Sequence, residues 1–244
     1  MKNIWIIAKR ELRTFFDSLI AYILLVVFLV LTGFLTWIYG INNGDIFSSG
    51  ITSLRWFFYY AQFTLIIFIP ALTMRMIAEE RNTGTLEILL TRAVTDWQVV
   101  AGKYLGGLLM ICITLAFTLP YYFGLAYLGP VDHGATWGGY LGLIFLSSAY
   151  LGIGIFCSSI TNNQIVAFLL AIILCAAFGI VFEIVSMSLS GSLGSVIQFL
   201  SANDHFASMQ RGVIDLRDVI FFLSLTFMGL ILAEMQLVKR NILA

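Results

Sequence analysis

Charged residues are scarce in this sequence. Of its 244 residues, 11% are Asp, Glu, Lys or Arg, whereas a soluble globular domain has about 25%. Thirteen cations balance thirteen anions, so net charge gives no reason to expect nucleic acid as a partner. Apolar residues make up 60% of the chain and gather in long blocks, several of which reach the ~20 residues that cross a bilayer. The chain therefore belongs in a membrane and has no room for a separate soluble domain.

Catalytic and metal-binding motifs are also missing. The sequence contains no G-x-x-x-x-G-K-[ST] phosphate loop, no H-E-x-x-H and no G-x-S-x-G, which excludes ATP binding by a phosphate loop and argues against a membrane protease. Cys112, Cys157 and Cys175 lie inside apolar blocks, at spacings that match neither a metal site nor a disulfide framework. We therefore expect no enzyme, and no catalytic, cofactor or metal site in this chain.

Six apolar segments predict six membrane-spanning helices, because a segment in lipid must satisfy its own backbone hydrogen bonds. Their approximate limits are residues 18–39, 56–76, 99–128, 136–160, 164–187 and 218–238. Pro70 and Pro120 predict kinks in the second and third spans. The expected fold is an all-α membrane protein, a single domain over residues 1–244.

The cations set the expected orientation. With the N-terminus in the cytoplasm, three cations lie outside (Arg55, Arg211 and Arg217) and ten lie inside (Lys2, Lys9, Arg10, Arg13, Arg75, Arg81, Arg92, Lys103, Lys239 and Arg240). Ten against three fits the positive-inside rule. Both termini are therefore predicted to be cytoplasmic.

Residues 1–17 carry an amphipathic pattern. Their apolar stripe consists of Ile4, Ile7, Ala8, Leu12 and Phe15, while the cations take other faces. The pattern predicts an interfacial helix in the inner leaflet. The alternative is an ordinary basic flank of the first span.

The sequence also predicts the structure of the connections after the third span. Residues 161–163 form a tight turn, and Asn163 can cap the fifth span. The outer loop, residues 188–217, is apolar enough to form short helices that re-enter the outer leaflet.

The pairs Gly102 with Gly106 and Gly138 with Gly142 have the spacing that lets helix backbones approach closely.

A charged stretch, EERNTGTLEILLTR at residues 79–92, separates the second and third spans. Its leucines and Ala93 recur at helical spacing, which predicts a short amphipathic helix at about residues 85–94. Thr95 and Gln98 then have the spacing of a capping box for the third span. The short helix is either a solvated connector or a contact surface for a soluble partner, and its stripe of three leucines favours the contact surface.

This stretch resembles the hallmark of ABC-2 type permeases, the membrane subunits of ATP-driven exporters. The matching residues are Glu79-Glu80, the run from Thr83 to Leu90, and Gly102-Lys103-Tyr104-Leu105; the family commonly has proline where this chain has Ala93. The outer stretch from His205 to Asp218 is similar to that of a subgroup associated with bacterial gliding motility.

The resemblance implies a mechanism and its partners. Two permeases, either two copies or related chains, form the path through a bacterial inner membrane, and each rests a coupling helix in a separate ABC ATPase subunit that binds ATP and Mg²⁺. The implied coupling residues are Glu79, Glu80, Gly84, Leu86, Glu87, Leu89, Leu90 and Arg92. Membrane lipids surround the spans, and the apolar spans suit a hydrophobic or lipid-linked cargo.

Two alternative hypotheses about function remain open. An ion-coupled secondary transporter needs ionisable groups in its spans, and Glu183 in the fifth span is the clearest candidate for a pathway or outer-gate residue. Glu183 is otherwise a group near the interface that contacts the outer loop. The second rival is a membrane scaffold that transports nothing.

Overall fold

The structure is helical throughout the part of the chain that it describes. The computed structural model describes residues 2–40, 45–50, 52–84, 95–189 and 191–243, and these contain no strand. Within the described ranges up to residue 128, the helices are α1 (Lys2–Asp17), α2 (Leu19–Trp37), α3 (Ile46–Ser49), α4 (Arg55–Thr73), α5 (Ala78–Asn82), α7 (Asp96–Ala116) and α8 (Leu119–Leu128). The others are α9 (His133–Ile160), α10 (Gln164–Ala176), the π-helical turn η2 (Ala177–Val181), α11 (Phe182–Ser188), α12 (Ser192–Phe199), α13 (Ala202–Gln210) and α14 (Leu216–Leu243).

Six helical segments in these ranges are long and apolar enough to cross a membrane. They are Leu19–Trp37, Arg55–Asn82, Asp96–Leu128, His133–Ile160, Gln164–Ser188 and Leu216–Lys239. Each one overlaps one of the six predicted spans, so the expected class, an all-α protein with six membrane-spanning helices, is confirmed.

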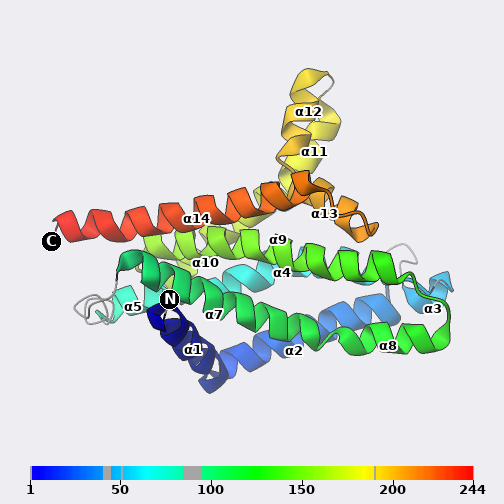
Figure 1. Cartoon of the computed structure of the whole chain (residues 1–244), viewed down its shortest axis with the longest axis horizontal. Coiled ribbons are helices and arrows are strands. Elements are labelled where there is room, and N and C mark those ends of the chain that lie inside the picture. The colour runs from blue at the N-terminus through cyan, green and yellow to red at the C-terminus, as the bar shows by residue number, and fades with distance from the viewer. Residues whose placement is uncertain (1, 41–44, 51, 85–94, 190, 244) are drawn as a thin grey trace.

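Helix α9 is the centre of the bundle. It packs against α4, α7, α10, α13 and α14, and Figure 1 shows it running between α14 and α7. Small residues permit the closest of these contacts: a Cβ atom added at Gly229 of α14 would lie 2.5 Å from the carbonyl carbon of Gly152 in α9. Backbones in this contact therefore touch directly, as expected where small residues line a helix interface in a membrane.

The third span is broken near its proline, as predicted. Helix α7 ends at Ala116, and α8 begins at Leu119 with Pro120 in its first turn, where the missing N–H of proline costs no helical hydrogen bond. Pro70 behaves differently, because α4 continues through it and ends at Thr73. The second span then resumes as α5, so its break falls at residues 74–77.

Both predicted helix caps are present. The Thr95 hydroxyl accepts a hydrogen bond from the Gln98 backbone N–H at 3.3 Å. The Asn163 side chain accepts one from the Ile165 N–H at 2.9 Å. The short turn before Asn163 makes α9 and α10 packed neighbours.

The predicted outer loop forms the short helices α12 and α13. In Figure 1, α11 and α12 project sideways from the bundle, away from α14. The π-helical turn η2 precedes this departure, and π-helical turns are a known cause of sharp changes in helix direction. The insertion of these helices into the outer leaflet stays a prediction.

The two ends of the bundle contain different helices. Helices α1 and α5, the start of α7 and the C-terminal end of α14 lie together at one end, and α3, α13 and the end of α8 lie at the other (Figure 1). We call these the α1 end and the α3 end. The assignment of the α1 end to the cytoplasm follows from the distribution of cations and remains a prediction.

Candidate functional site

Helix α1 packs closely on α7 because α7 presents glycines to it. A Cβ atom added at Gly102 would lie 2.7 Å from Ile7, and one at Gly106 would lie 2.7 Å from the Glu11 Cβ. Ile7 and Ala8, which belong to the stripe that we expected to face the leaflet, are buried here. The predicted amphipathic helix therefore exists, but part of its apolar stripe faces α7.

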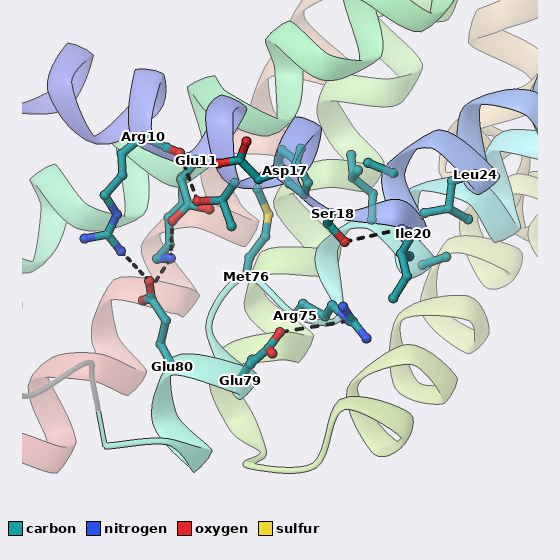
Figure 2. A pocket seen from close by; sticks show the side chains of 16 residues that line it. Arg10, Glu11, Asp17, Ser18, Ile20, Leu24, Arg75, Met76, Glu79 and Glu80 are labelled. Carbon is teal, nitrogen blue, oxygen red and sulfur yellow. Dashed lines mark hydrogen bonds and ion pairs between the residues drawn. The ribbon is translucent and has the colours of Figure 1, made fainter.

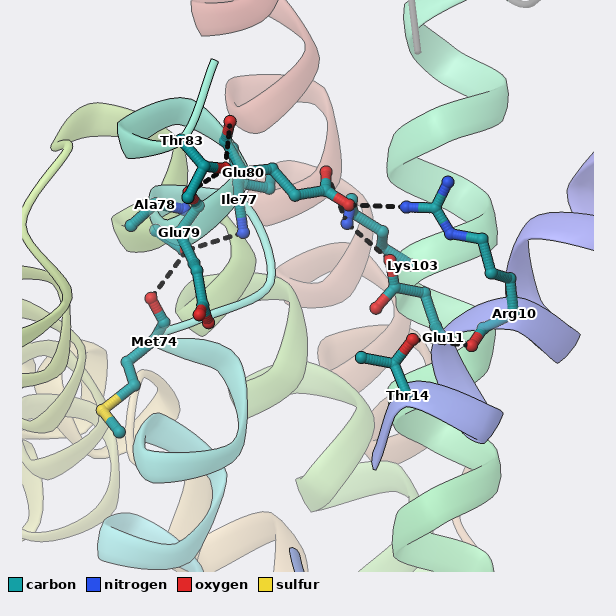
Figure 3. A network of polar contacts seen from close by, with 11 residues as sticks. Arg10, Glu11, Thr14, Met74, Ile77, Ala78, Glu79, Glu80, Thr83 and Lys103 are labelled. Carbon is teal, nitrogen blue, oxygen red and sulfur yellow. Dashed lines mark hydrogen bonds and ion pairs between the residues drawn. The ribbon is translucent and has the colours of Figure 1, made fainter. Parts of the chain in front are cut away.

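A cluster of four charged side chains lies beside this contact. The Lys103 ammonium group in α7 lies 2.6 Å from the Glu11 Oε1 atom of α1 and 2.9 Å from the Glu80 Oε2 atom of α5. The Arg10 guanidinium lies 2.8 Å from the Glu80 Oε1 atom. Figure 3 shows the four side chains converging from the three helices. We call Arg10, Glu11, Glu80 and Lys103 the ion network.

The ion network is balanced in charge, and it runs from the buried Lys103 to Arg10, whose side chain is 51% exposed. Two cations face two carboxylates, and the Lys103 side chain is only 1% exposed. A lone charge at such a site is costly, whereas one that is paired and hydrogen-bonded is tolerated. Separation of α5 from α7 would leave Lys103 with one carboxylate instead of two, so the network favours joint movement of the three helices.

Helix α5 is also fixed to the central helix. The Ser158 hydroxyl of α9 accepts hydrogen bonds from the Ile77 and Ala78 N–H groups, at 3.1 Å and 3.0 Å, and donates one to the Met74 carbonyl at 3.2 Å. The Arg81 guanidinium donates to the Ser159 carbonyl at 2.7 Å. The short segment before the predicted coupling helix is thus attached to α1, α7 and α9.

The predicted coupling residues fall into two groups. Glu80 lies in the ion network, Glu79 lies 3.9 Å from Arg75, and Gly84 follows α5 with a φ of +70°, a left-handed conformation that glycine adopts without strain. The predicted coupling helix at residues 85–94 lies outside the described residues, and so do the other predicted coupling residues: Leu86, Glu87, Leu89, Leu90 and Arg92.

Glu183 lies in α11, far from the ion network in the chain and in space (Figure 1). Its Oε2 atom accepts a hydrogen bond from the Asn203 side chain at 2.5 Å. Asn203 belongs to α13, which forms part of the outer loop, so this contact matches the alternative in which Glu183 contacts that loop.

Sequence reasoning missed three members of the ion network: Arg10, Glu11 and Lys103. One signal was available, because Glu11 follows Ile4, Ile7 and Ala8 on the apolar face of α1, where a carboxylate needs a partner. Its partner Lys103 is 92 residues away in the sequence. No local pattern joins two positions so far apart.

The fold and the site together define a class: a multi-pass helical membrane protein with a charged segment between its second and third spans. Comparison with protein families agrees, since the model described as ABC-2 family transporter protein matches residues 5–218. The chain belongs to this family and is a permease component of an ABC transporter. No curated protein matches the chain.

Proposed function

We propose that this permease is driven by a separate ABC ATPase subunit that contacts residues 79–92. The observation that carries the proposal is the ion network, which joins Glu80, next to the predicted coupling helix, to α1 and α7. The chain has no phosphate loop of its own, so ATP and Mg²⁺ bind to the partner. Leu86, Leu89 and Leu90 supply the apolar contact, and Glu87 and Arg92 fix its register through charge pairs.

The contacts of α5 suggest how movement passes inward. A displacement of residues 85–94 pulls on α5, which immediately precedes them. Glu80 transmits the displacement to Lys103 and Arg10, and the Ser158 hydroxyl transmits it to α9. Since α9 also packs against α4, α7, α10, α13 and α14, a small shift there alters the packing of the whole bundle.

The narrower parts of the proposal rest on sequence resemblance. The permease acts as an exporter with a second permease copy or a related chain, in a bacterial inner membrane. The stretch from His205 to Asp218 supports a role in gliding motility or a related export process.

Co-purification of matched variants tests the coupling proposal. The double variant Gly84→Ala/Glu87→Gln changes the turn and one charge of the proposed contact, while the control Glu183→Gln makes the same acid-to-amide change at the other end of the bundle. We expect both proteins in the membrane fraction, with the ATPase recovered only with the control. Normal recovery of the ATPase with the double variant would overturn the proposal.

A further inference from the structure

A polar pocket lies at the α1 end of the bundle. It has a volume of 420 Å³ and is enclosed by the connection from α1 to α2 on one side and by α4 and α5 on the other. Figure 2 shows Asp17, Arg75 and Glu79 around it, together with Arg10, Glu11 and Glu80 of the ion network. Charged side chains from three helices therefore border one cavity.

Three of these charges lie outside the ion network: Asp17, Arg75 and Glu79. The Arg75 Nε atom is buried and has no hydrogen-bond partner within the described ranges. Its distance to the Glu79 Oε2 atom is 3.9 Å, which is too long for a hydrogen bond. The pocket thus presents a guanidinium whose Nε atom lacks a hydrogen-bond acceptor, together with two carboxylates. These groups favour a ligand that carries both signs of charge.

An apolar groove continues from the pocket. Leu24 and Ala71 line both cavities. The groove has a volume of 480 Å³ and runs along α2 as far as Leu35 and along α4 as far as Tyr59. From Leu24 to Leu35 the axial distance is about 16 Å at 1.5 Å per residue, close to half of the ~30 Å hydrocarbon core. Its length therefore fits an acyl chain of one leaflet.

We propose that the pocket and the groove together bind one phospholipid whose headgroup carries a phosphate and an ammonium group. The phosphate accepts hydrogen bonds from Arg75, as guanidinium groups pair well with phosphate oxygens. The ammonium group donates to Asp17 and Glu79, and an acyl chain occupies the groove. A headgroup with negative charge alone would be repelled by these two carboxylates.

A helix of a second permease copy is the rival occupant of the groove. Its apolar side chains would fill the groove but would leave the Arg75 Nε atom without an acceptor, which costs free energy when the atom is buried. The lipid satisfies both parts of the site. The lipid site does not depend on the ATPase. Lipid binding can therefore be absent while the proposed coupling to the ATPase holds, and the coupling can be absent while the lipid binds.

Native mass spectrometry of the detergent-purified chain, titrated with phosphatidylethanolamine or phosphatidylglycerol, tests the site. We expect one phosphatidylethanolamine per chain, bound about tenfold more tightly than phosphatidylglycerol. Arg75→Gln is expected to weaken binding of both lipids. Glu79→Gln is expected to reduce the difference in affinity between phosphatidylethanolamine and phosphatidylglycerol.

Two adjacent valines provide a matched control. Val26 and Val27 are 54% and 51% exposed, but only Val27 lines the groove. Val27→Trp is expected to lower lipid retention about tenfold, and Val26→Trp to leave it unchanged. Equal effects of the two substitutions, equal binding of the two lipids by the unaltered protein, or a Val27→Cys cross-link between copies with no bound lipid would each overturn the proposal.

Discussion

The Lys103 ammonium group of α7 lies 2.6 Å from the Glu11 carboxylate of α1, and the side chains are 1% and 9% exposed. The pair lies where Gly106 lets the two helices touch. Lys103 also contacts Glu80, so one cation pairs with carboxylates from two different helices. This arrangement makes the interface of α1, α5 and α7 sensitive to the loss of a single charge.

Replacement of Lys103 by methionine leaves Glu11 buried without a cation. We expect Lys103→Met to lower the free energy of unfolding by about 3–5 kcal/mol, measured as a lower thermal transition in detergent. The double variant Glu11→Leu/Lys103→Met removes both charges and is expected to recover most of the loss, while Arg10 still pairs with Glu80. A double variant no more stable than Lys103→Met would contradict the view that the unpaired Glu11 carboxylate causes the loss.

Enlargement of Gly106 forces α1 away from α7, because the new Cβ would lie 2.7 Å from the Glu11 Cβ and 3.2 Å from the Ala8 carbonyl oxygen. We expect Gly106→Ala to destabilise the protein by about 1–3 kcal/mol. The control is Gly124→Ala in α8, where a Cβ meets the Trp37 ring at an ordinary 3.5 Å. Equal thermal transitions for the two variants would contradict the close contact of α1 with α7.

Sequence reasoning succeeded where the signal is local. Hydropathy predicted the spans, and the caps at Thr95 and Asn163 depend on backbone groups only two or three residues away. Pro120 was informative for the same reason, since a proline acts on its own helix.

The contacts that the sequence did not predict join residues that are far apart in the chain. The Ser158 hydroxyl is bonded to backbone groups about 80 residues earlier, at Ile77 and Ala78. Similarly, the apolar side of α1 was expected to face lipid, because an amphipathic pattern does not say whether its apolar side meets a bilayer or another helix.

Ser158 stabilises the break between α4 and α5. We expect Ser158→Ala to cost about 1–3 kcal/mol, because it leaves two buried N–H groups without an acceptor. Ser147 lies on the same helix, is also fully buried, and has no hydrogen-bond partner for its hydroxyl in the described part of the chain. Ser147→Ala should therefore be neutral or stabilising in the same thermal assay, and a similar loss for both variants would contradict the role of the Ser158 hydrogen bonds.

A buried pair of side chains, His205 and Asp218, joins helices at the α3 end. The His205 Nδ1 atom lies 2.7 Å from the Asp218 Oδ1 atom, and Nε2 lies 2.9 Å from the Phe199 carbonyl oxygen. Both ring nitrogens therefore have a hydrogen-bond partner, one on α14 and one on α12. We expect Asp218→Asn to weaken this contact by about 1.5–3 kcal/mol and to speed hydrogen exchange in α12 and α13. Unchanged exchange there, with exchange in α1 and α7 as the internal reference, would show that the pair does not hold these helices.

Purification of the tagged chain from its native membranes in mild detergent tests the central claim most directly. Co-purifying proteins are identified by mass spectrometry, and the preparation is assayed for vanadate-sensitive ATP hydrolysis. The account predicts recovery of a separate ATPase subunit with a phosphate-loop motif, together with vanadate-sensitive ATP hydrolysis. Recovery of the permease with no ATPase and no hydrolysis would contradict it and would make Glu183 the next residue to test for ion-coupled transport.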